Sequence, residues 1–420
     1  CHPQSVTPRS YGIIGYPTAR FTNGMAFKPN AWSENGVPII RIENLNGSPK
    51  YNRYDGDVDR SIYVTKGDLL FGWSGNKGTS FGPFLWDKNG LFYLNQHIFK
   101  VHNINSNRNW FYWALIAVTR TIEEETHGII GMVHVTKGKL GAVLIPDIPH
   151  DEEVLTAKFL YRETTRLDTL IEKKERFIEL LQEKRQALIT QAVTKGLTNV
   201  PMKDSGVEWI GEVPAHWDVV PLRRIGKLQG GSGFPLNLQG EESGDIGFYK
   251  VGDLAASEDD VELGKPSHFI SEATASSIGA KTLPKGSICW AKIGAAASLN
   301  RRRITPDKCC IDNNMTGFLL DHRLANIQYL HFLLSIIDFN PLMRPGAVPS
   351  LSEGEQGRIL VALPPLEEQR DISFYLKSES QRLEVLTEKT RQSIDLLKER
   401  RSSLITAAVT GKIDVRGKAA

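Results

Sequence analysis

The chain has 420 residues, too many for one ordinary hydrophobic core. Charged residues make up 24% and aromatic residues 9%, a globular composition that argues against disorder. Its formal net charge of +3 neither demands nor excludes a nucleic-acid partner, so any basic surface must be local. No apolar run of about 18 residues or more occurs, so we expect no membrane span, and four cysteines without regular spacing favour a reducing cytoplasm.

Residues 1–150 are predicted to form the first of two α+β domains, which we call the first head. The runs VPIIRI, SIYVT and DLLFGW are rich in β-branched and aromatic residues and are separated by Gly, Asn, Asp and Pro, as strands and turns are. The apolar segment WFYWALIAVTRTI, which starts at Trp110, has the length of a helix. Strands and helix together predict a mixed α+β fold.

Residues 151–198 are predicted to form a long helix. Apolar residues recur with a period close to 3.5 and are flanked by charged residues, while the proline-bearing entry IPDIPHDEE and the later Gly196 suit the two helix ends. A helix of some 40 residues measures roughly 60 Å. Because one isolated helix cannot bury such a seam, the pattern predicts a helical partner.

The second half of the chain repeats this order. Residues 199–365 again combine β-type runs, IGFYKV and SICWAKI, with an apolar helical segment, ANIQYLHFLLSII, and predict a second head. Residues 366–415 predict a second long helix, in which Ser373–Ile413 aligns without gaps with Ala157–Leu197, charged positions included. We expect the two helices to pair as a coiled coil. The pairing residues are predicted to be Leu167, Leu181, Leu188, Leu383, Leu397 and Leu404.

The sequence contains no recognisable catalytic or metal-binding constellation. The NPL segment at Asn340 lacks the second proline and the aromatic residue of the amino-methyltransferase motif. Cys309, Cys310 and His322 do not have the spacing of a zinc site, and no GxGxxG or P-loop follows a predicted strand. We therefore expect a non-catalytic chain without a cofactor or metal of its own.

Several basic, amide and aromatic residues suit a nucleic-acid surface. The cluster Arg301–Arg303 offers phosphate contacts and a fork for guanine, and a solvated charge run is the alternative. The pairs Asn95–Gln96 and Asn313–Asn314 can read adenine edges, although turn chemistry is the stronger expectation for asparagine alone. The candidate DNA-contacting residues are Arg41, Trp73, Asn76, Lys77, Asn95, Gln96, Lys250, Lys292, Arg301, Arg302, Arg303, Asn313 and Asn314.

Together these features resemble the DNA-specificity (S) subunit of type I restriction-modification systems, over essentially the whole chain. The resemblance rests on NGMAFKPNAW, GVPIIRIENLNG, KGDLLF, LPPLEEQRDI, the helix ends ELLQEKRQALITQAVTKG and LLKERRSSLITAAVTGKI, and KDSGVEWIGEVPAHWDVVPLRRI from Lys203. The last segment opens the second head, and nothing similar precedes the first. We expect either that the first head begins differently or that the sequence is truncated before Cys1.

The resemblance implies a mechanism. Each head would be a target-recognition domain that binds one half of a split sequence in double-stranded DNA, and the two helices would pair antiparallel and set the gap between the halves. Two modification subunits would dock on this scaffold and bring S-adenosylmethionine and methyl transfer. Restriction subunits would add translocation and cleavage, with ATP and Mg. The S subunit itself would not be catalytic, and the complex would act in the cytoplasm, away from membranes.

Two alternatives stay open. In the first, the chain is a coiled-coil adaptor whose heads bind protein, which predicts no affinity for any DNA sequence. In the second, it is a stand-alone enzyme with an unfamiliar site, which predicts turnover by the purified chain. The duplication argues against a single-site enzyme, and the basic and amide-bearing loops favour DNA over protein.

Overall fold

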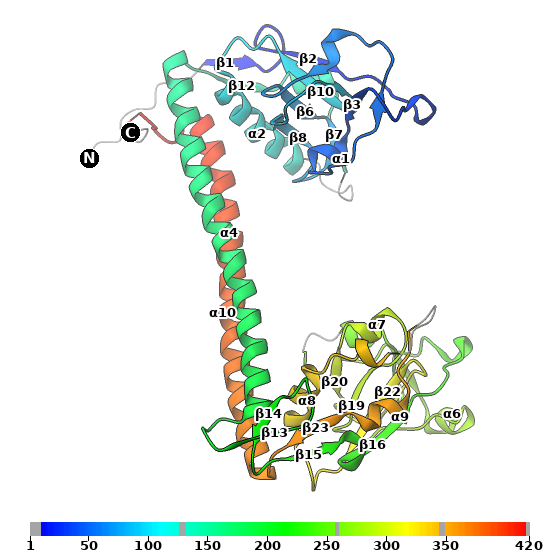
Figure 1. The fold of residues 1–420 in the computed structure, drawn as a ribbon. Coiled ribbons are helices and arrows are strands. Elements are labelled where there is room, and N and C mark those ends of the chain that lie inside the picture. The colour runs from blue at the N-terminus through cyan, green and yellow to red at the C-terminus, as the bar shows by residue number, and fades with distance from the viewer. Residues whose placement is uncertain (1–9, 126–131, 257–259, 344–348, 417–420) are drawn as a thin grey trace. The chain divides into compact units, whose positions relative to one another are not determined.

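Cys1 lies outside the part of the chain that the computed structural model describes. That part comprises residues 10–125, 132–256, 260–343 and 349–416. Contacts divide the chain into two units (Figure 1), unit 1 being Cys1–Glu175 with Arg391–Ala420 and unit 2 being Arg176–Thr390. Each unit therefore contains one globular head and one half of each long helix, whereas the predicted domain boundaries separate heads from helices and stay predictions.

In the described residues, two four-stranded sheets form most of the head of unit 1, and β7 (Ser74–Asn76) and β11 (Met132–His134) pair separately. The first is antiparallel, with the strand order β2 (Arg20–Asn23), β10 (Ile98–His102), β6 (Leu69–Gly72) and β8 (Gly82–Leu85). The second is mixed, with the order β4 (Arg53–Tyr54), β3 (Val37–Ile40), β9 (Phe92–Leu94) and β5 (Tyr63–Val64). In the second sheet β3 and β9 run parallel, so their carboxyl ends meet at one edge.

Helix α2 (Arg108–Glu125) packs against the first sheet. The side chain of Asn107 accepts hydrogen bonds from the backbone N–H groups of Asn109 and Trp110, both at 3.1 Å, which fixes the start of the helix. Trp110 and Phe111 are buried in one cluster with strand residues of the sheet. A helix that is apolar around most of its circumference needs such cover on several sides.

The head of unit 2 repeats this architecture. Its antiparallel sheet has the order β16 (Gly226–Gly230), β22 (Met315–Leu320), β19 (Ile288–Ala291) and β20 (Arg302–Ile304). Its mixed sheet has the order β18 (His268–Ile270), β17 (Ile246–Tyr249) and β21 (Cys309–Ile311), with β17 and β21 parallel. Helix α8 (Ile327–Ser335) takes the place of α2, and Asn326 caps it as Asn107 caps α2.

Each head passes into a long helix through a two-stranded ribbon. In unit 1 the ribbon is β1 (Ser10–Ile13) with β12 (Leu144–Asp147), followed by α4 (His150–Lys195). In unit 2 it is β15 (Asp218–Pro221) with β23 (Leu360–Leu363), followed by α10 (Leu366–Val409). The shorter elements are α1 (Ile42–Leu45), β7 (Ser74–Asn76), β11 (Met132–His134), α3 (Lys137–Gly141), β13 (Met202–Asp204), β14 (Glu212–Pro214), α5 (Asp253–Ala256), α6 (Glu272–Ser277), α7 (Ala295–Ser298) and α9 (Glu353–Arg358).

The two long helices pair antiparallel, which confirms the predicted fold class. In unit 1, Arg401 of α10 contacts Asp168 of α4 at 2.8 Å and Lys398 contacts Glu175 at 3.9 Å, so residue numbers rise on one helix as they fall on the other. In unit 2, the buried core includes residues from the end of α4 and the start of α10. Figure 1 shows the two helices side by side.

The six predicted pairing leucines differ in burial. Leu167, Leu181 and Leu383 are buried, while Leu188, Leu397 and Leu404 are half-buried. Apolar residues at the edge of the predicted stripe remain exposed, with Leu170 at 38%, Phe177 at 44% and Leu386 at 39%. The seam between the helices is therefore narrower than the apolar stripe in the sequence, and the rest of the stripe faces outward.

No helix in the described part of the chain combines the length and the apolar character that crossing a membrane requires.

Candidate nucleic-acid interface

The carboxyl ends of the parallel strands place two predicted residues at one edge of the first head. Arg41 directly follows β3, and Asn95 directly follows β9. The backbone N–H of Asn95 donates to the Ile40 carbonyl at 3.0 Å, which ties the two chain segments together. The Arg41 side chain donates to Asn52 at 2.8 Å and lies 5.3 Å from the ring of Trp32, and its exposed fraction is 38%.

A glycine loop after β2 lies directly against this edge. A Cβ on Gly24 would lie 2.2 Å from the carbonyl oxygens of Leu94 and Asn95, so no other residue fits without moving the backbone. The next residue, Met25, donates its backbone N–H to the Leu94 carbonyl at 2.8 Å. Phe27 then anchors the loop by packing on Tyr54 and Tyr93.

The end of β6 completes the edge with an indole ring. The backbone N–H of Trp73 donates to the His97 carbonyl at 3.2 Å, and its Nε1 donates to the Gln96 carbonyl at 2.9 Å. The ring lies 5.5 Å from the His97 ring and 6.5 Å from that of His134. Because Trp73 is half-buried and held at both polar atoms, it offers a fixed aromatic edge to a partner.

The same framework recurs in unit 2 with different side chains. Lys250 follows β17, and the backbone N–H of Asp312, which follows β21, donates to the Tyr249 carbonyl at 2.9 Å. A Cβ on Gly231 would lie 2.0 Å from the Asp312 carbonyl oxygen, as close an approach as that of the glycine loop in unit 1. Phe234 anchors this loop by stacking on Phe248 at 3.9 Å.

Lys292 occupies in unit 2 the position that Trp73 occupies in unit 1. Its backbone N–H donates to the Asn314 carbonyl at 2.8 Å, just as Trp73 donates to the carbonyl of the corresponding turn. Its ammonium group lies 3.8 Å from Glu353. Lys250 donates to the Gln239 side chain at 3.0 Å. The structure thus gathers Arg41, Trp73, Asn95 and Gln96 in unit 1 and Lys250, Lys292, Asn313 and Asn314 in unit 2.

The predicted amide pairs are not at matched positions. Asn95 is 9% exposed, and its side chain accepts from the backbone N–H of His97, at 3.4 Å. In unit 2, Asp312 does the same for Asn314 at 2.7 Å. Asn95 therefore matches Asp312 and accepts within its own turn, as turn chemistry predicts for asparagine, and Gln96 matches Asn313.

The prediction that the cluster Arg301–Arg303 contacts DNA is also corrected, because two of its three arginines are buried in the interior. Arg302 is 2% exposed and Arg303 is 5% exposed, while Arg301 is exposed. Both lie on β20, which packs against α8. Successive side chains of a strand point to opposite faces, and both are buried here: Arg302 donates to backbone carbonyls and Arg303 pairs with the Asp260 carboxylate at 2.9 Å, so neither is placed to contact phosphates. Only Arg301 remains a candidate.

Backbone carbonyls accept hydrogen bonds from both terminal nitrogens of the Arg302 guanidinium. It donates to the carbonyls of Ile337 at 3.0 Å and Asn300 at 2.6 Å and lies 4.1 Å from the Phe339 ring centroid. Burial lowers the pKa of Arg302 to about 9. The buried imidazole of His331 lies against the Arg302 carbonyl at 3.1 Å, and burial lowers its pKa to about 4, so it is neutral and donates through Nε2.

The remaining predicted residues, Asn76 and Lys77, lie on an exposed hairpin. Lys77 donates to the Glu123 carbonyl at 3.0 Å, and the next residue, Gly78, donates to the Glu123 carboxylate at 2.8 Å. These contacts hold the hairpin to α2. Both side chains are solvent-accessible and stay candidates for DNA contact.

One sequence pattern at this surface was overlooked. In each head the glycine that touches the turn is followed three residues later by the anchoring phenylalanine, Gly24 with Phe27 and Gly231 with Phe234. No sequence pattern pointed to three further residues near this surface, the half-buried His97 and the exposed His134 and Glu353. Segments distant in the sequence bring them there.

The cysteine thiols in the described residues are buried. Burial raises the pKa of the Cys289 thiol to about 12 and that of Cys310 to about 11, so both stay protonated and poorly nucleophilic at neutral pH. Within the described ranges, no group of three or more His, Cys, Asp or Glu residues could hold a metal ion.

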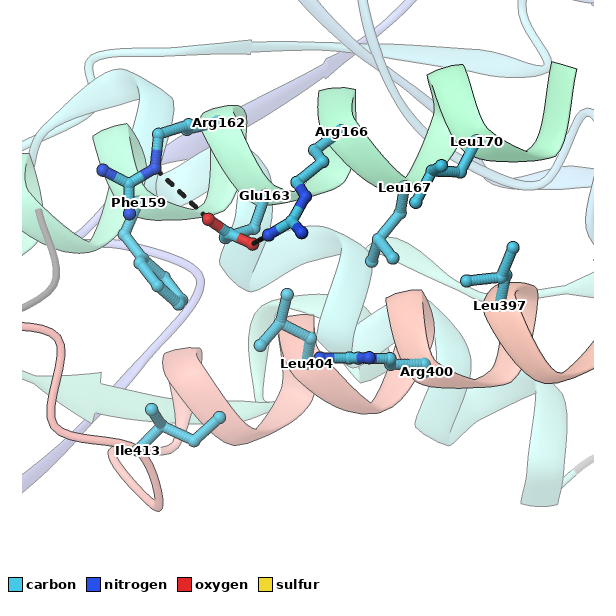
Figure 2. A pocket seen from close by; sticks show the side chains of 10 residues that line it. All are labelled: Phe159, Arg162, Glu163, Arg166, Leu167, Leu170, Leu397, Arg400, Leu404 and Ile413. Atoms are coloured by element: carbon cyan, nitrogen blue, oxygen red, sulfur yellow. Dashed lines mark hydrogen bonds and ion pairs between the residues drawn. The ribbon is translucent and has the colours of Figure 1, made fainter. Parts of the chain in front are cut away.

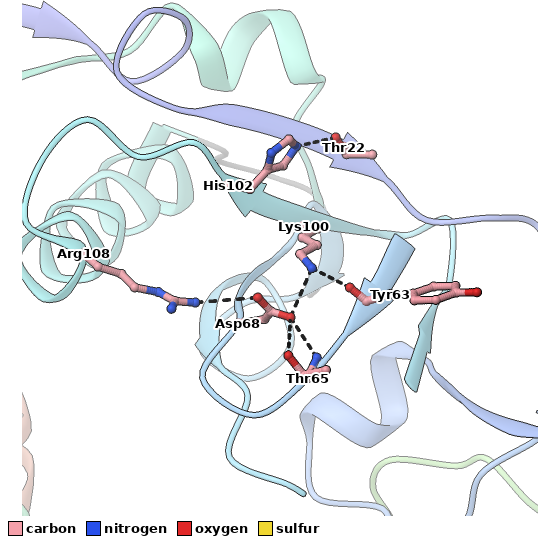
Figure 3. A network of polar contacts seen from close by, with 7 residues as sticks. All are labelled: Thr22, Tyr63, Thr65, Asp68, Lys100, His102 and Arg108. Atoms are coloured by element: carbon pink, nitrogen blue, oxygen red, sulfur yellow. Dashed lines mark hydrogen bonds and ion pairs between the residues drawn. The ribbon is translucent and has the colours of Figure 1, made fainter. Parts of the chain in front are cut away.

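A polar network that the sequence did not indicate stabilises the first head (Figure 3). Asp68 accepts from the backbone N–H of Thr65 at 2.8 Å and from the Lys100 ammonium group at 3.1 Å, and Arg108 lies 3.9 Å from it. Lys100 also donates to the Tyr63 carbonyl. Through these contacts Asp68, which directly precedes β6, joins β5, β10 and α2.

An open groove lies between α4 and α10 in unit 1 (Figure 2). Its volume is about 490 Å³. Glu163 forms ion pairs with Arg162 at 3.2 Å and Arg166 at 3.7 Å along its rim. The groove is lined by Phe159, Arg162, Glu163, Arg166, Leu167, Leu170, Leu397, Arg400, Leu404 and Ile413. It combines an apolar floor with a basic rim.

Comparisons with known sequences match both heads to one family. The family model described as "Type I restriction modification DNA specificity domain" matches residues 20–180 and 214–395. The MjaVIII specificity subunit of Methanocaldococcus jannaschii is 24% identical over 373 residues, 86% of this chain and 82% of that protein. The EcoBI specificity subunit of Escherichia coli is 29% identical over 184 residues, 43% of this chain and 38% of that protein.

Solved structures share the fold. One chain, from a study of complex assembly and conformational transition of the type I R-M system, matches with a TM-score of 0.68 at 15% identity, covering 96% of this chain and 100% of that one. The HsdS subunit from Thermoanaerobacter tengcongensis matches with a TM-score of 0.53 at 14% identity, covering 94% and 98%.

Proposed function

The chain belongs to the family of type I restriction-modification DNA specificity proteins, and from this premise we propose that it is the sequence-reading subunit of such a system. Each head binds one half of a split motif in double-stranded DNA. The helices α4 and α10, which continue from one unit into the other, hold the two heads at a fixed spacing.

One observation carries this proposal, namely a single framework that occurs twice with different exposed side chains. In both heads equivalent backbone hydrogen bonds join three segments. These are a glycine loop, a turn after a parallel strand and the end of a central strand. The side chains on this framework differ, with Trp73 in unit 1 and Lys292 in unit 2. Two readers for two different half-sites require this combination of constant support and variable surface.

Several basic side chains of the two heads suit a polyanion. Arg41, Lys250 and the exposed Arg301 can contact phosphates, and Gln96 and Asn313 can reach base edges. Phosphate contacts set the register of a protein on the duplex, while contacts to base edges select the sequence.

The chain itself carries no chemistry in this proposal. Two modification subunits supply methyl transfer from S-adenosylmethionine, and restriction subunits supply translocation and cleavage with ATP and Mg, in the cytoplasm. The groove between the helices, with its apolar floor and the arginines Arg162, Arg166 and Arg400, suits an amphipathic helix of a modification subunit that carries acidic residues. The outward Leu170 extends the apolar floor.

Mapping of methylated adenines tests the reading function. The chain is co-expressed with its modification subunit, and methylated positions are mapped across the host DNA. We expect a split motif with a fixed gap of unspecified bases, and exchange of residues 1–150 for those of a relative should change one half only. A soluble complex that methylates no defined motif contradicts the proposal and favours the adaptor whose heads bind protein.

Co-purification tests the docking groove. Leu170→Glu places a carboxylate on the apolar floor and should abolish recovery of the modification subunit with the tagged chain. Thr169→Glu adds the same charge at the neighbouring exposed position, which does not line the groove, and should leave recovery unchanged. Equal recovery with both variants contradicts this docking site.

A further inference from the structure

We infer that Glu353 is a specificity-determining residue of unit 2, where its carboxylate accepts a hydrogen bond from the N4 amino group of a cytosine in the major groove. This inference rests on the proposed function, because it assigns one base contact to the unit 2 surface. Among side chains, carboxylates are the acceptors suited to cytosine N4.

The backbone places Glu353 at the candidate surface. Leu351 donates its N–H to the Lys292 carbonyl at 2.9 Å, so the start of α9 lies beside the end of β19. The Glu353 carboxylate is 3.8 Å from the Lys292 ammonium group. A Cβ on Gly230 would lie 2.5 Å from Glu353 Oε1 and 2.9 Å from Lys292 Nζ, so both charged groups lie over the glycine loop.

The exposure of the two groups suits a reading contact. The Glu353 side chain is 47% exposed, while that of Lys292 is 18% exposed. The lysine therefore lies deeper and supports the carboxylate from below, and the carboxylate reaches solvent. A partially supported carboxylate loses less rotamer freedom when it binds a base than a free one does.

Helix capping does not explain this carboxylate. The cap of α9 is made by Ser352, whose hydroxyl accepts from the Glu355 N–H at 3.3 Å, and by Glu355, whose carboxylate accepts from the Ser352 N–H at 3.0 Å. Glu353 takes no part in that reciprocal pair. Its carboxylate points away from the cap, toward Lys292.

The corresponding position in unit 1 has the opposite charge. There Val135 donates its N–H to the Trp73 carbonyl at 3.0 Å, as Leu351 does to Lys292, and Thr136 caps α3 as Ser352 caps α9. The residue after the cap is Lys137 in unit 1 and Glu353 in unit 2. A lysine here favours any DNA sequence, whereas a carboxylate is repelled by phosphates and is tolerated where a base donor meets it.

Selection from a randomised half-site tests the inference. The parent chain, Glu353→Gln and Glu353→Ala are each assembled with modification subunits and bound to duplexes in which the unit 2 half of the motif is randomised. We expect the parent to prefer cytosine at one position of one strand. In both variants the ratio of binding to cytosine over the other bases at that position should fall about tenfold. Both variants should also bind non-cognate duplexes more tightly, because a negative charge has been removed.

A matched control and the opposing outcomes complete the test. Glu212→Gln removes an exposed carboxylate of β14 in the same unit and should leave the preference profile unchanged. An unchanged profile in both Glu353 variants beside a selective parent overturns this inference alone, as does relaxation only at a position where the parent prefers an A·T pair, which has no cytosine N4 on either strand. A parent complex without any sequence preference overturns the proposed function, and this inference with it.

Discussion

The ends of β6 and β19 have the same backbone contacts and opposite surface chemistry. Trp73 and Lys292 both donate their N–H to the turn that precedes the neighbouring strand, yet one presents an indole ring and the other an ammonium group. Lys137 and Glu353 likewise differ in charge at matched positions after a helix cap. Because the framework depends on backbone atoms, these exposed side chains can vary without loss of the fold, which is what a change of target sequence requires.

The edge strands of the two units differ for another reason. In unit 1, Pro83 pairs with Phe71, and in unit 2, Arg302 pairs with Trp290 at the matching register. The Arg302 guanidinium is buried and donates to backbone carbonyls, so this difference concerns the interior. A difference between the heads therefore points to DNA recognition only where the side chain reaches the surface.

Among the changes that separate the two units, Arg302→Ala is expected to have the largest effect on stability. The change removes the Arg302 donor to the Asn300 carbonyl and one of the two donors to the Ile337 carbonyl, which keeps the Asn300 side-chain amide at 2.7 Å, and it opens a cavity beside Phe339. We expect it to destabilise unit 2 by about 3 kcal/mol. Hydrogen exchange of peptides from β20 and α8 should accelerate, while exchange in α2 of unit 1 should not. The neighbouring Arg301→Ala removes an exposed arginine and serves as the control, and equal acceleration by both would show that Arg302 has no special structural role.

Repetition explains how much of the fold was predictable from the sequence. The long helices were evident because Ala157–Leu197 and Ser373–Ile413 keep both apolar and charged positions, and periodicity is a local property. The parallel pairing of β3 with β9 was not evident, because these strands are distant in the chain and no local pattern specifies their neighbours.

The candidate surface was predictable only in part, for a related reason. Residue type suggested that Arg302, Arg303 and Asn95 face DNA, but residue type does not give side-chain direction. Arg302 turns inward because the Ile337 carbonyl, contributed by a distant segment, accepts its hydrogen bond. Asn95 turns inward because its own turn needs an acceptor for the His97 N–H.

A smaller effect is expected from Asp68→Ser. Asp68 follows a Lys-Gly pair in unit 1, and Ser287 follows the corresponding Lys-Gly pair in unit 2, so the change gives unit 1 the residue of unit 2. Serine cannot reach both the Thr65 N–H and the Lys100 ammonium group, so unit 1 should lose about 1–2 kcal/mol of stability. Urea unfolding measures the loss. Asp87→Ser changes an exposed aspartate of the same head and should cost almost nothing, and a similar loss in both variants would contradict the importance of the network.

Glu153 and Gln369 provide the last comparison, at the start of the two long helices. Gln369 accepts from the Asn326 N–H at 2.7 Å and donates to the Pro364 carbonyl at 2.8 Å. Glu153 accepts from the Asn107 N–H at 2.7 Å in the same way, and His150 lies 3.2 Å from it. A carboxylate cannot donate as the amide does, and burial raises the pKa of Glu153 above its ordinary value of about 4.5 despite these two contacts.

The raised pKa of Glu153 makes the stability of unit 1 depend on pH. The folded state binds this proton more tightly than the unfolded state, so the contribution of Glu153 to stability is greatest below pH 4.5 and is lost as the pH rises through the raised pKa. Glu153→Gln should remove that loss and raise stability at pH 8 by about 1 kcal/mol, the size of a gained hydrogen bond. Unfolding measured between pH 4 and pH 8 should show a flatter profile for this variant than for the parent. Gln369→Glu should introduce the same downward slope into unit 2, and parallel profiles for all three proteins would mean that the proton on Glu153 is not linked to folding.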